Sequence, residues 1–112
     1  MPRDEALLLD IYLSAQEATE FLNDIEWEVF EFSKLHQNAV IRSLEVIGEA
    51  AKLVSEDTRN KLPEIPWPVV VRMRNRLIHE YFRVNLRIVW DTVKNDLPPL
   101  IEILSKVVTT DE

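Results

Sequence analysis

The sequence predicts a single all-α domain, a bundle of four to five helices, on the basis of three observations. The chain has 112 residues, enough for one hydrophobic core, and 46% of them are hydrophobic while 29% are charged. Apolar residues recur every three to four positions over long stretches, which is the period of an amphipathic helix. Only one glycine is present, whereas β-hairpins depend on turns that contain glycine. We therefore treat residues 1–112 as one helical domain.

The first half of the chain contains two long helical stretches. A first helix is expected over residues 4–23, with Asp4 as its N-cap, and residues 26–32 form a short mixed segment. A second long helix is expected over residues 33–54. Gly48 inside this helix costs about 1 kcal/mol relative to alanine, and we interpret it as a point where another helix comes close.

Prolines mark the middle of the chain. Residues 55–57 open a short helical turn, and three prolines keep residues 62–68 from being the interior of a helix. Pro68 suits the first turn of a helix over residues 68–82, because the N–H that proline lacks is not needed there.

The C-terminal part is expected to be helical as well. Asn85 suits the N-cap of a helix over residues 86–96. Pro98 and Pro99 interrupt or kink this helix before it continues over residues 100–108.

Composition excludes several kinds of site. The chain has no cysteine, and its two histidines, His36 and His79, are too far apart in sequence to form a metal pair on one helix. We therefore expect no metal and no cofactor, and we expect His36 to be structural or solvated. No apolar run approaches the roughly 20 residues that span a bilayer, and the N-terminus lacks the positive charge of a signal peptide. We expect a cytoplasmic protein that makes no membrane contact.

Positive charge is concentrated in one segment of an acidic chain. The net charge of −7 argues against general affinity for nucleic acids. Residues 72–87, however, hold five of the 13 basic residues and one of the 20 acidic ones. Such an island can attract a polyanion to one place, although a solvated helix face is the more common explanation of a charge cluster.

The helix predicted over residues 68–82 has two apolar faces when its residues are placed about 100° apart around the axis. One strip suits the bundle core, and the other lies on the opposite side of Arg74. The first strip consists of Val70, Met73, Leu77 and Tyr81, and the second of Val71, Ile78 and Phe82. Because a second apolar face must be buried against something, we expect a two-fold homodimer, with Arg74 and His79 bordering the second strip.

Four blocks of the sequence, in order, resemble one known family. Residues 74–81, Arg-Asn-Arg-Leu-Ile-His-Glu-Tyr, match the Arg-x4-His-x-Tyr motif of HepT-like toxins, within the HEPN superfamily of small α-helical ribonucleases. Residues 42–52 and 63–67 resemble two further blocks of that family, and residues 89–93 with 96–100 resemble its C-terminal helix. The resemblance implies a HEPN-like bundle that acts as a homodimeric, metal-independent endoribonuclease, the toxin of a toxin–antitoxin pair. The implied partner is an MntA-type nucleotidyltransferase, which silences the toxin by attaching AMP to the motif tyrosine, here Tyr81.

The residue types suit metal-independent cleavage of RNA. This reaction needs a base for the 2′-hydroxyl, an acid for the 5′-oxygen and positive charge on the phosphate in the transition state. His79 can act as base or acid because histidine titrates at about pH 6.5, and Arg74 offers a charged planar fork to phosphate. Asn75, one turn before His79, can orient the imidazole or the phosphate. One histidine cannot easily be both acid and base, whereas the two His79 side chains of a dimer can.

Residues around the motif include candidates for RNA binding, and some of them differ from the usual family sequence. The candidate RNA-binding residues are Arg72, Arg76 and Arg83. Glu80 and Arg83 stand where the family usually has glycine, and Asn85 stands where it often has aspartate. These replacements change the charge and the loop next to the motif, whereas the three motif residues are intact.

Other interpretations remain open at this stage. The chain can instead be a non-enzymatic helical module that binds a nucleotidyltransferase and presents nucleotide or substrate to it. Glu45 and Glu49 are four residues apart and can form a metal pair or a second acid–base pair, although salt bridges to Arg42 and Lys52 are the more common outcome. Trp67 and Trp90 are expected in the core or in an interface.

Overall fold

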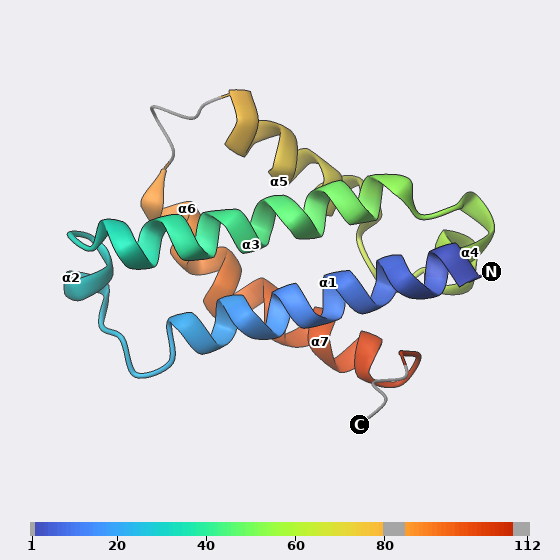
Figure 1. Cartoon of the computed structure of the whole chain (residues 1–112), viewed down its shortest axis with the longest axis horizontal. Coiled ribbons are helices and arrows are strands. Elements are labelled where there is room, and N and C mark those ends of the chain that lie inside the picture. The colour runs from blue at the N-terminus through green and yellow to red at the C-terminus, as the bar shows by residue number, and fades with distance from the viewer. Residues whose placement is uncertain (1, 80–84, 109–112) are drawn as a thin grey trace.

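The computed structural model of the protein describes residues 2–79 and 85–108, and the side chains of residues 3–74 and 85–108 among them. The described residues contain helices and no strand, which confirms the predicted all-α class (Figure 1). In chain order the elements are α1 (Pro2–Phe21), α2 (Trp27–Phe30), α3 (Lys34–Leu53), α4 (Glu56–Lys61), α5 (Trp67–His79), α6 (Leu86–Asp91), the π-helical segment η2 (Thr92–Asp96) and α7 (Leu97–Ser105).

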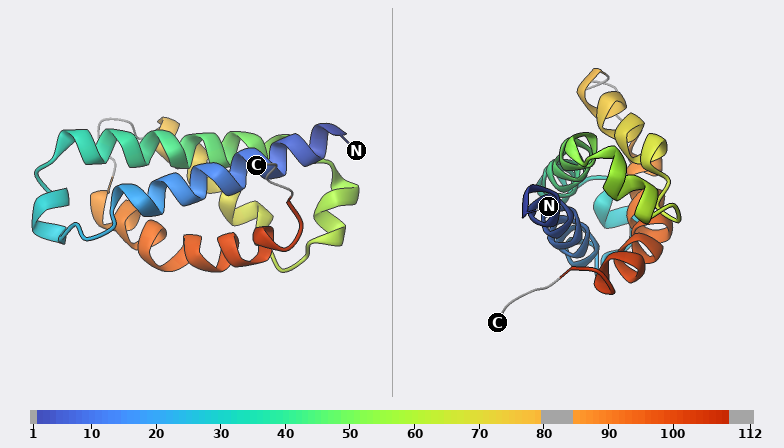
Figure 2. Two further views of the ribbon diagram at one scale, coloured as in Figure 1. Left: turned by 60° about the horizontal axis from the view of Figure 1, so that its bottom comes forward. Right: turned by 90° about the vertical axis from the view of Figure 1, so that its right-hand side faces the viewer.

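The core forms where α1 and α3 lie antiparallel, side by side, with α7 against the opposite flank of α1 (Figures 1 and 2). Buried residues occur at alternating intervals of three and four in both long helices, so each helix turns one stripe inward. In α1 the stripe is Leu8, Ile11, Ala15 and Ala18, continued by Leu22 just after the helix, and in α3 it is Val40, Leu44, Ile47 and Ala51. Burial of each large aliphatic side chain contributes about 1.5–3 kcal/mol, which makes this pair the rigid base for the rest of the fold.

Local capping signals place the starts of several helices as predicted. Ser33 caps α3 by accepting from the backbone N–H of His36, and Ser55 caps α4 in the same way. The Asn85 side chain accepts from two backbone N–H groups in the first turn of α6.

The predicted role of Asp4 as the N-cap of the first helix is wrong. The helix begins two residues earlier, and Asp4 lies inside it with its carboxylate buried. That carboxylate accepts hydrogen bonds from the Ser55 hydroxyl at 2.5 Å and from the Thr58 hydroxyl at 2.6 Å. The hydroxyl of Ser55, and then that of Thr58, lower the pKa of Asp4 from its ordinary value. Asp4 therefore ties the start of α1 to the start of α4.

The two C-terminal prolines do not interrupt the last helix. Residues 86–105 form one continuous helical run, and its irregularity is the π-helical segment Thr92–Asp96, immediately before the prolines. Pro98 and Pro99 then occupy the first turn of α7, where their missing N–H groups are tolerated. The widened turn of η2 thus adjusts the helix to its prolines.

Helix α5 begins at Trp67, one residue before the predicted start. The Trp67 ring is buried, and its Nε1–H donates to the carbonyl of Leu62 at 3.1 Å, which fixes the connector to the helix. In the right-hand view of Figure 2 the far end of α5 projects beyond the other helices. Residues 80–82 of the predicted helix lie outside the described residues.

Across residues 2–79 and 85–108, none of the helices combines the length and the apolar character that a membrane crossing requires.

Candidate active site

The site is built where α5 packs against α3 at Gly48. A Cβ atom placed on Gly48 would lie 2.0 Å from the Cβ and 2.9 Å from the Cγ of Arg74. Side chains do not tolerate contacts this short, so only glycine allows the two helices to meet here. The expected close approach at Gly48 is confirmed, and the residue that meets it is the arginine of the motif.

The guanidinium of Arg74 is held by the residue after Gly48. Arg74 Nη2 lies 3.5 Å from Glu49 Oε2, and the Arg74 side chain is 21% exposed while that of Glu49 is 60% exposed. On the same helix Arg42 pairs with Glu45 at 3.8 Å, as predicted. Among the described residues Glu49 pairs with Arg74 rather than with the expected Lys52, because α5 brings Arg74 over this part of α3.

The motif histidine shares a helix with Arg74 but occupies a different position around its axis. Arg74 and His79 are both in α5, and five residues of helix separate them by about 7.5 Å along the axis and about 140° around it. The side chains of Asn75, Arg76 and His79 lie outside the described part, as do Tyr81 and Arg83 entirely.

An open, largely apolar groove of about 620 Å³ lies between α3, α5, α6 and α7, and Arg74 is not among the residues that line it. Its apolar wall includes Leu44, Ile47, Val70, Met73, Val89 and Leu100. Val70 and Met73, the members of the first apolar strip whose side chains are described, pack partly buried against the core as predicted. Val71, which was assigned to the second strip, also packs partly buried against the core. Arg72, a candidate RNA-binding residue, is exposed and lies at this groove.

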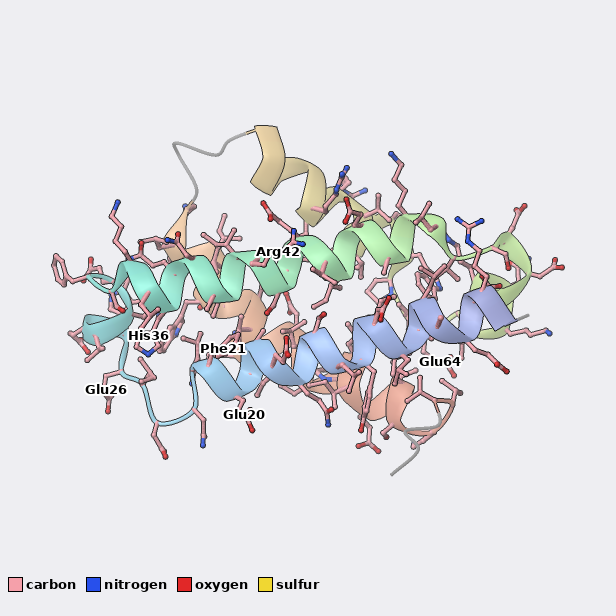
Figure 3. All side chains as sticks on the ribbon, viewed as in Figure 1. Glu20, Phe21, Glu26, His36, Arg42 and Glu64 are labelled. Atoms are coloured by element: carbon pink, nitrogen blue, oxygen red, sulfur yellow. The ribbon has the colours of Figure 1, made fainter. Side chains whose placement is uncertain are left out.

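His36 takes no part in this arrangement. It lies in the first turn of α3, about 18 Å along the helix from Gly48, and Figure 3 labels it at that end of the molecule. Its Nδ1 lies 2.6 Å from the Ser33 hydroxyl, a local contact at the start of the helix that agrees with the structural role expected for it.

The described residues hold no group of three or more histidine, aspartate and glutamate side chains that could bind a metal. At Arg74 itself, the described groups are the guanidinium and the carboxylate of Glu49.

Comparison with known proteins decides the family. A family model described as "Ribonuclease HepT-like" matches residues 11–107. The chain belongs to the HepT-like ribonuclease family. It is 43% identical over 110 residues to "Putative RNase MJ0127" of Methanocaldococcus jannaschii, which covers 96% of this chain and 91% of the relative. It is 47% identical over 93 residues to "Probable ribonuclease HepT" of Thermococcus cleftensis, which covers 83% and 84% of the two chains. No solved structure matches the chain.

Within this HepT-like ribonuclease, the structure brings into contact two of the sequence blocks that resemble the family. The motif arginine Arg74 rests on Gly48 and Glu49, which belong to the block over residues 42–52. The contact gives a reason for Gly48 and Glu49 in the middle of α3: the glycine leaves room for Arg74, and the carboxylate pairs with its guanidinium. Sequence reasoning found Gly48 but missed the role of Glu49, because its partner lies on another helix.

Proposed function

We propose that this HepT-like protein is a metal-independent endoribonuclease toxin that works as a homodimer, with Arg74 and His79 as its catalytic residues. The observation that carries the proposal is the motif arginine, held against α3 on the same helix as the motif histidine, in a chain of a ribonuclease family. Asn75 is proposed as a supporting residue, and Arg72, Arg76 and Arg83 as residues that bind RNA.

The chemistry follows from the residue types. One His79 imidazole removes the proton of the 2′-hydroxyl, whose oxygen attacks the adjacent phosphorus. A second, protonated imidazole gives a proton to the 5′-oxygen as the P–O bond breaks. The products are a 2′,3′-cyclic phosphate and a 5′-hydroxyl. Arg74 stabilises the charge on the phosphate oxygens, because a guanidinium stays protonated and donates several N–H groups in one plane.

Two observations support a dimer as the active form. Arg74 and His79 are about 140° apart around α5, so a second chain is the natural source of the group that faces either of them. The groove of about 620 Å³ between α5 and its neighbours is largely apolar, and Val69 and Ile88, which line it, are 52% and 41% exposed. This groove is on the side of the first apolar strip of α5, not of the second strip on which the dimer was predicted. A second copy of the chain can cover such a surface.

The test is cleavage of total RNA by the purified protein in EDTA. We expect cleavage that leaves 2′,3′-cyclic phosphate ends and that is lost in His79→Ala and in Arg74→Ala. Light scattering at high micromolar concentration is expected to give the mass of a dimer. Intact RNA with folded wild-type protein, or a monomer under these conditions, contradicts the proposal.

We further propose that an MntA-type nucleotidyltransferase silences the toxin by transferring AMP from ATP to the Tyr81 hydroxyl, with release of pyrophosphate. Incubation with that enzyme and ATP is expected to add the mass of AMP to the wild type and not to Tyr81→Phe, and to abolish cleavage. Stable complex formation with the transferase, without cleavage by the unmodified wild type, instead supports a non-enzymatic module that presents substrate to the transferase.

A further inference from the structure

We propose that Glu49 is a positioning residue, which sets the orientation of the Arg74 guanidinium before RNA binds. This inference rests on the proposed ribonuclease function and extends it to a residue outside the Arg-x4-His motif. Glu49 lies on α3, whereas the motif lies on α5, so the positioning acts across the contact between the two helices.

Both ends of the Arg74 side chain are constrained by α3. At its base, Cβ and Cγ lie against the backbone of Gly48, where a Cβ atom would be 2.0 Å from Arg74 Cβ. At its tip, Nη2 lies 3.5 Å from Glu49 Oε2. With 21% of its side chain exposed, Arg74 is well buried for a residue type that usually extends into solvent.

The contact with Glu49 bears on the direction of the guanidinium. Its N–H donors lie in one fixed plane, so a carboxylate near Nη2 influences how that plane is turned. The distance of 3.5 Å is longer than the 2.7–2.9 Å of a strong charge-assisted hydrogen bond. Glu49 is therefore close enough to orient the group and too far to bind it tightly.

The exposure of Glu49 argues against a mainly stabilising role. Its side chain is 60% exposed, and ion pairs this open to solvent contribute little to folding stability. A carboxylate beside a phosphate-binding arginine also repels the RNA backbone, so it does not serve to strengthen binding of the substrate. Preorganisation of Arg74 for the transition state is the effect that remains.

The chain offers a matched control on the same helix. Glu45 lies one turn before Glu49, carries the same charge and pairs with Arg42 at 3.8 Å, a residue of α3 itself that is 72% exposed. Glu45→Gln removes the same charge from the same helix, and the ion pair it removes is with Arg42 of α3 rather than with Arg74 of α5. An effect of Glu49→Gln beyond that of Glu45→Gln is assigned to the contact with Arg74.

The experiment measures kcat and KM on bulk tRNA, together with the melting temperature, for wild type, Glu49→Gln, Glu49→Asp and Glu45→Gln. We expect Glu49→Gln to lower kcat about tenfold with KM unchanged or lower, because a misplaced group costs rate more than ground-state binding. Glu49→Asp is expected to fall between Glu49→Gln and wild type. The shape of the pH profile and the melting temperature are expected to match those of Glu45→Gln. The inference is overturned if Glu49→Gln and Glu45→Gln have equal kcat. It is also overturned if Glu49→Gln alters the acidic side of the plot of kcat against pH, because that would mark Glu49 as a proton-transfer group.

A second readout works without catalysis. The Arg74 Nε–Hε signal in a nitrogen-15 NMR spectrum, assigned by its loss in Arg74→Lys, is expected to shift in Glu49→Gln and not in Glu45→Gln. If wild type cleaves no RNA but this signal responds, the proposed function fails while the positioning contact stands. If wild type cleaves and neither kcat nor the signal responds to Glu49→Gln, the positioning role fails while the proposed function stands.

Discussion

Replacing Gly48 with alanine tests the contact on which the site depends. Alanine is the better helix residue by about 1 kcal/mol, so at an open position this change stabilises a protein. At Gly48 the new Cβ would lie 2.0 Å from Arg74 Cβ, whereas carbon atoms attract best at about 3.5–4.0 Å. The helices must therefore separate by about 1.5 Å, because Cβ is not the free end of a flexible chain.

The expected cost follows from these two terms. Overpacking of a well-packed contact costs about 1–3 kcal/mol or more, and an overlap this large belongs at the upper end. After the gain in helix propensity, we expect Gly48→Ala to destabilise the fold by about 2 kcal/mol. A shift of about 1.5 Å at Arg74 is expected to lower kcat by about 10²-fold, because catalytic groups tolerate little displacement.

The assay is thermal unfolding followed by circular dichroism, with two comparison variants. Asn38→Ala is made at an exposed position of α3 and gains helix propensity without a clash, so its melting temperature is expected to rise. Gly48→Ala with Arg74→Gly removes the Cβ that causes the overlap, so the double variant is expected to lose less stability than the sum of the two single variants. A melting temperature that rises in Gly48→Ala as it does in Asn38→Ala refutes the close contact.

Three other changes test separate parts of the structure. His79→Ala is expected to abolish RNA cleavage while His36→Ala leaves it intact, since His36 lies about 18 Å along α3 from Gly48; equal losses contradict this. Asp4 has a lowered pKa in the folded protein, so its contribution to stability is present at neutral pH and is lost as the pH falls below about 4 and through that lowered pKa. In urea titrations, Asp4→Asn is therefore expected to be less stable than wild type at neutral pH, with a gap that narrows in acid, whereas a constant gap argues against the lowered pKa. Trp67→Phe removes the hydrogen bond to the Leu62 carbonyl and is expected to lower the free energy of unfolding by about 1–3 kcal/mol in the same titrations. An unchanged free energy of unfolding would show that the indole N–H does not stabilise the fold.

Local signals in the sequence were sufficient for most of the helices. Ser33, Ser55 and Asn85 each accept hydrogen bonds from residues two or three positions ahead, and such signals can be read within one turn of helix. The intervals between apolar residues likewise depend on a single helix at a time. The predicted class and the order of the helices followed from these signals.

Contacts between distant residues could not be found in this way. The Asp4 carboxylate accepts a hydrogen bond from Ser55, 51 residues away in the sequence. The neighbouring sequence indicated only that Asp4 could cap its own helix. Glu49 has Lys52 within one turn, yet it pairs with Arg74 on another helix. Gly48 was the one exception, because a glycine that costs helix propensity in the middle of a long helix indicates a close contact without naming the partner.

The placement of Arg74 gives a physical reason for dividing the site between two chains. Arg74 lies where α5 crosses α3, with its Cβ and Cγ against Gly48 and its guanidinium near the Glu49 carboxylate. Five residues further along, the helix reaches His79 at its projecting end, on a face about 140° away. Two positions separated in this way are more readily combined at one phosphate by two helices than by one. In the dimer that we propose, the second copy of α5 supplies the complementary position by two-fold symmetry.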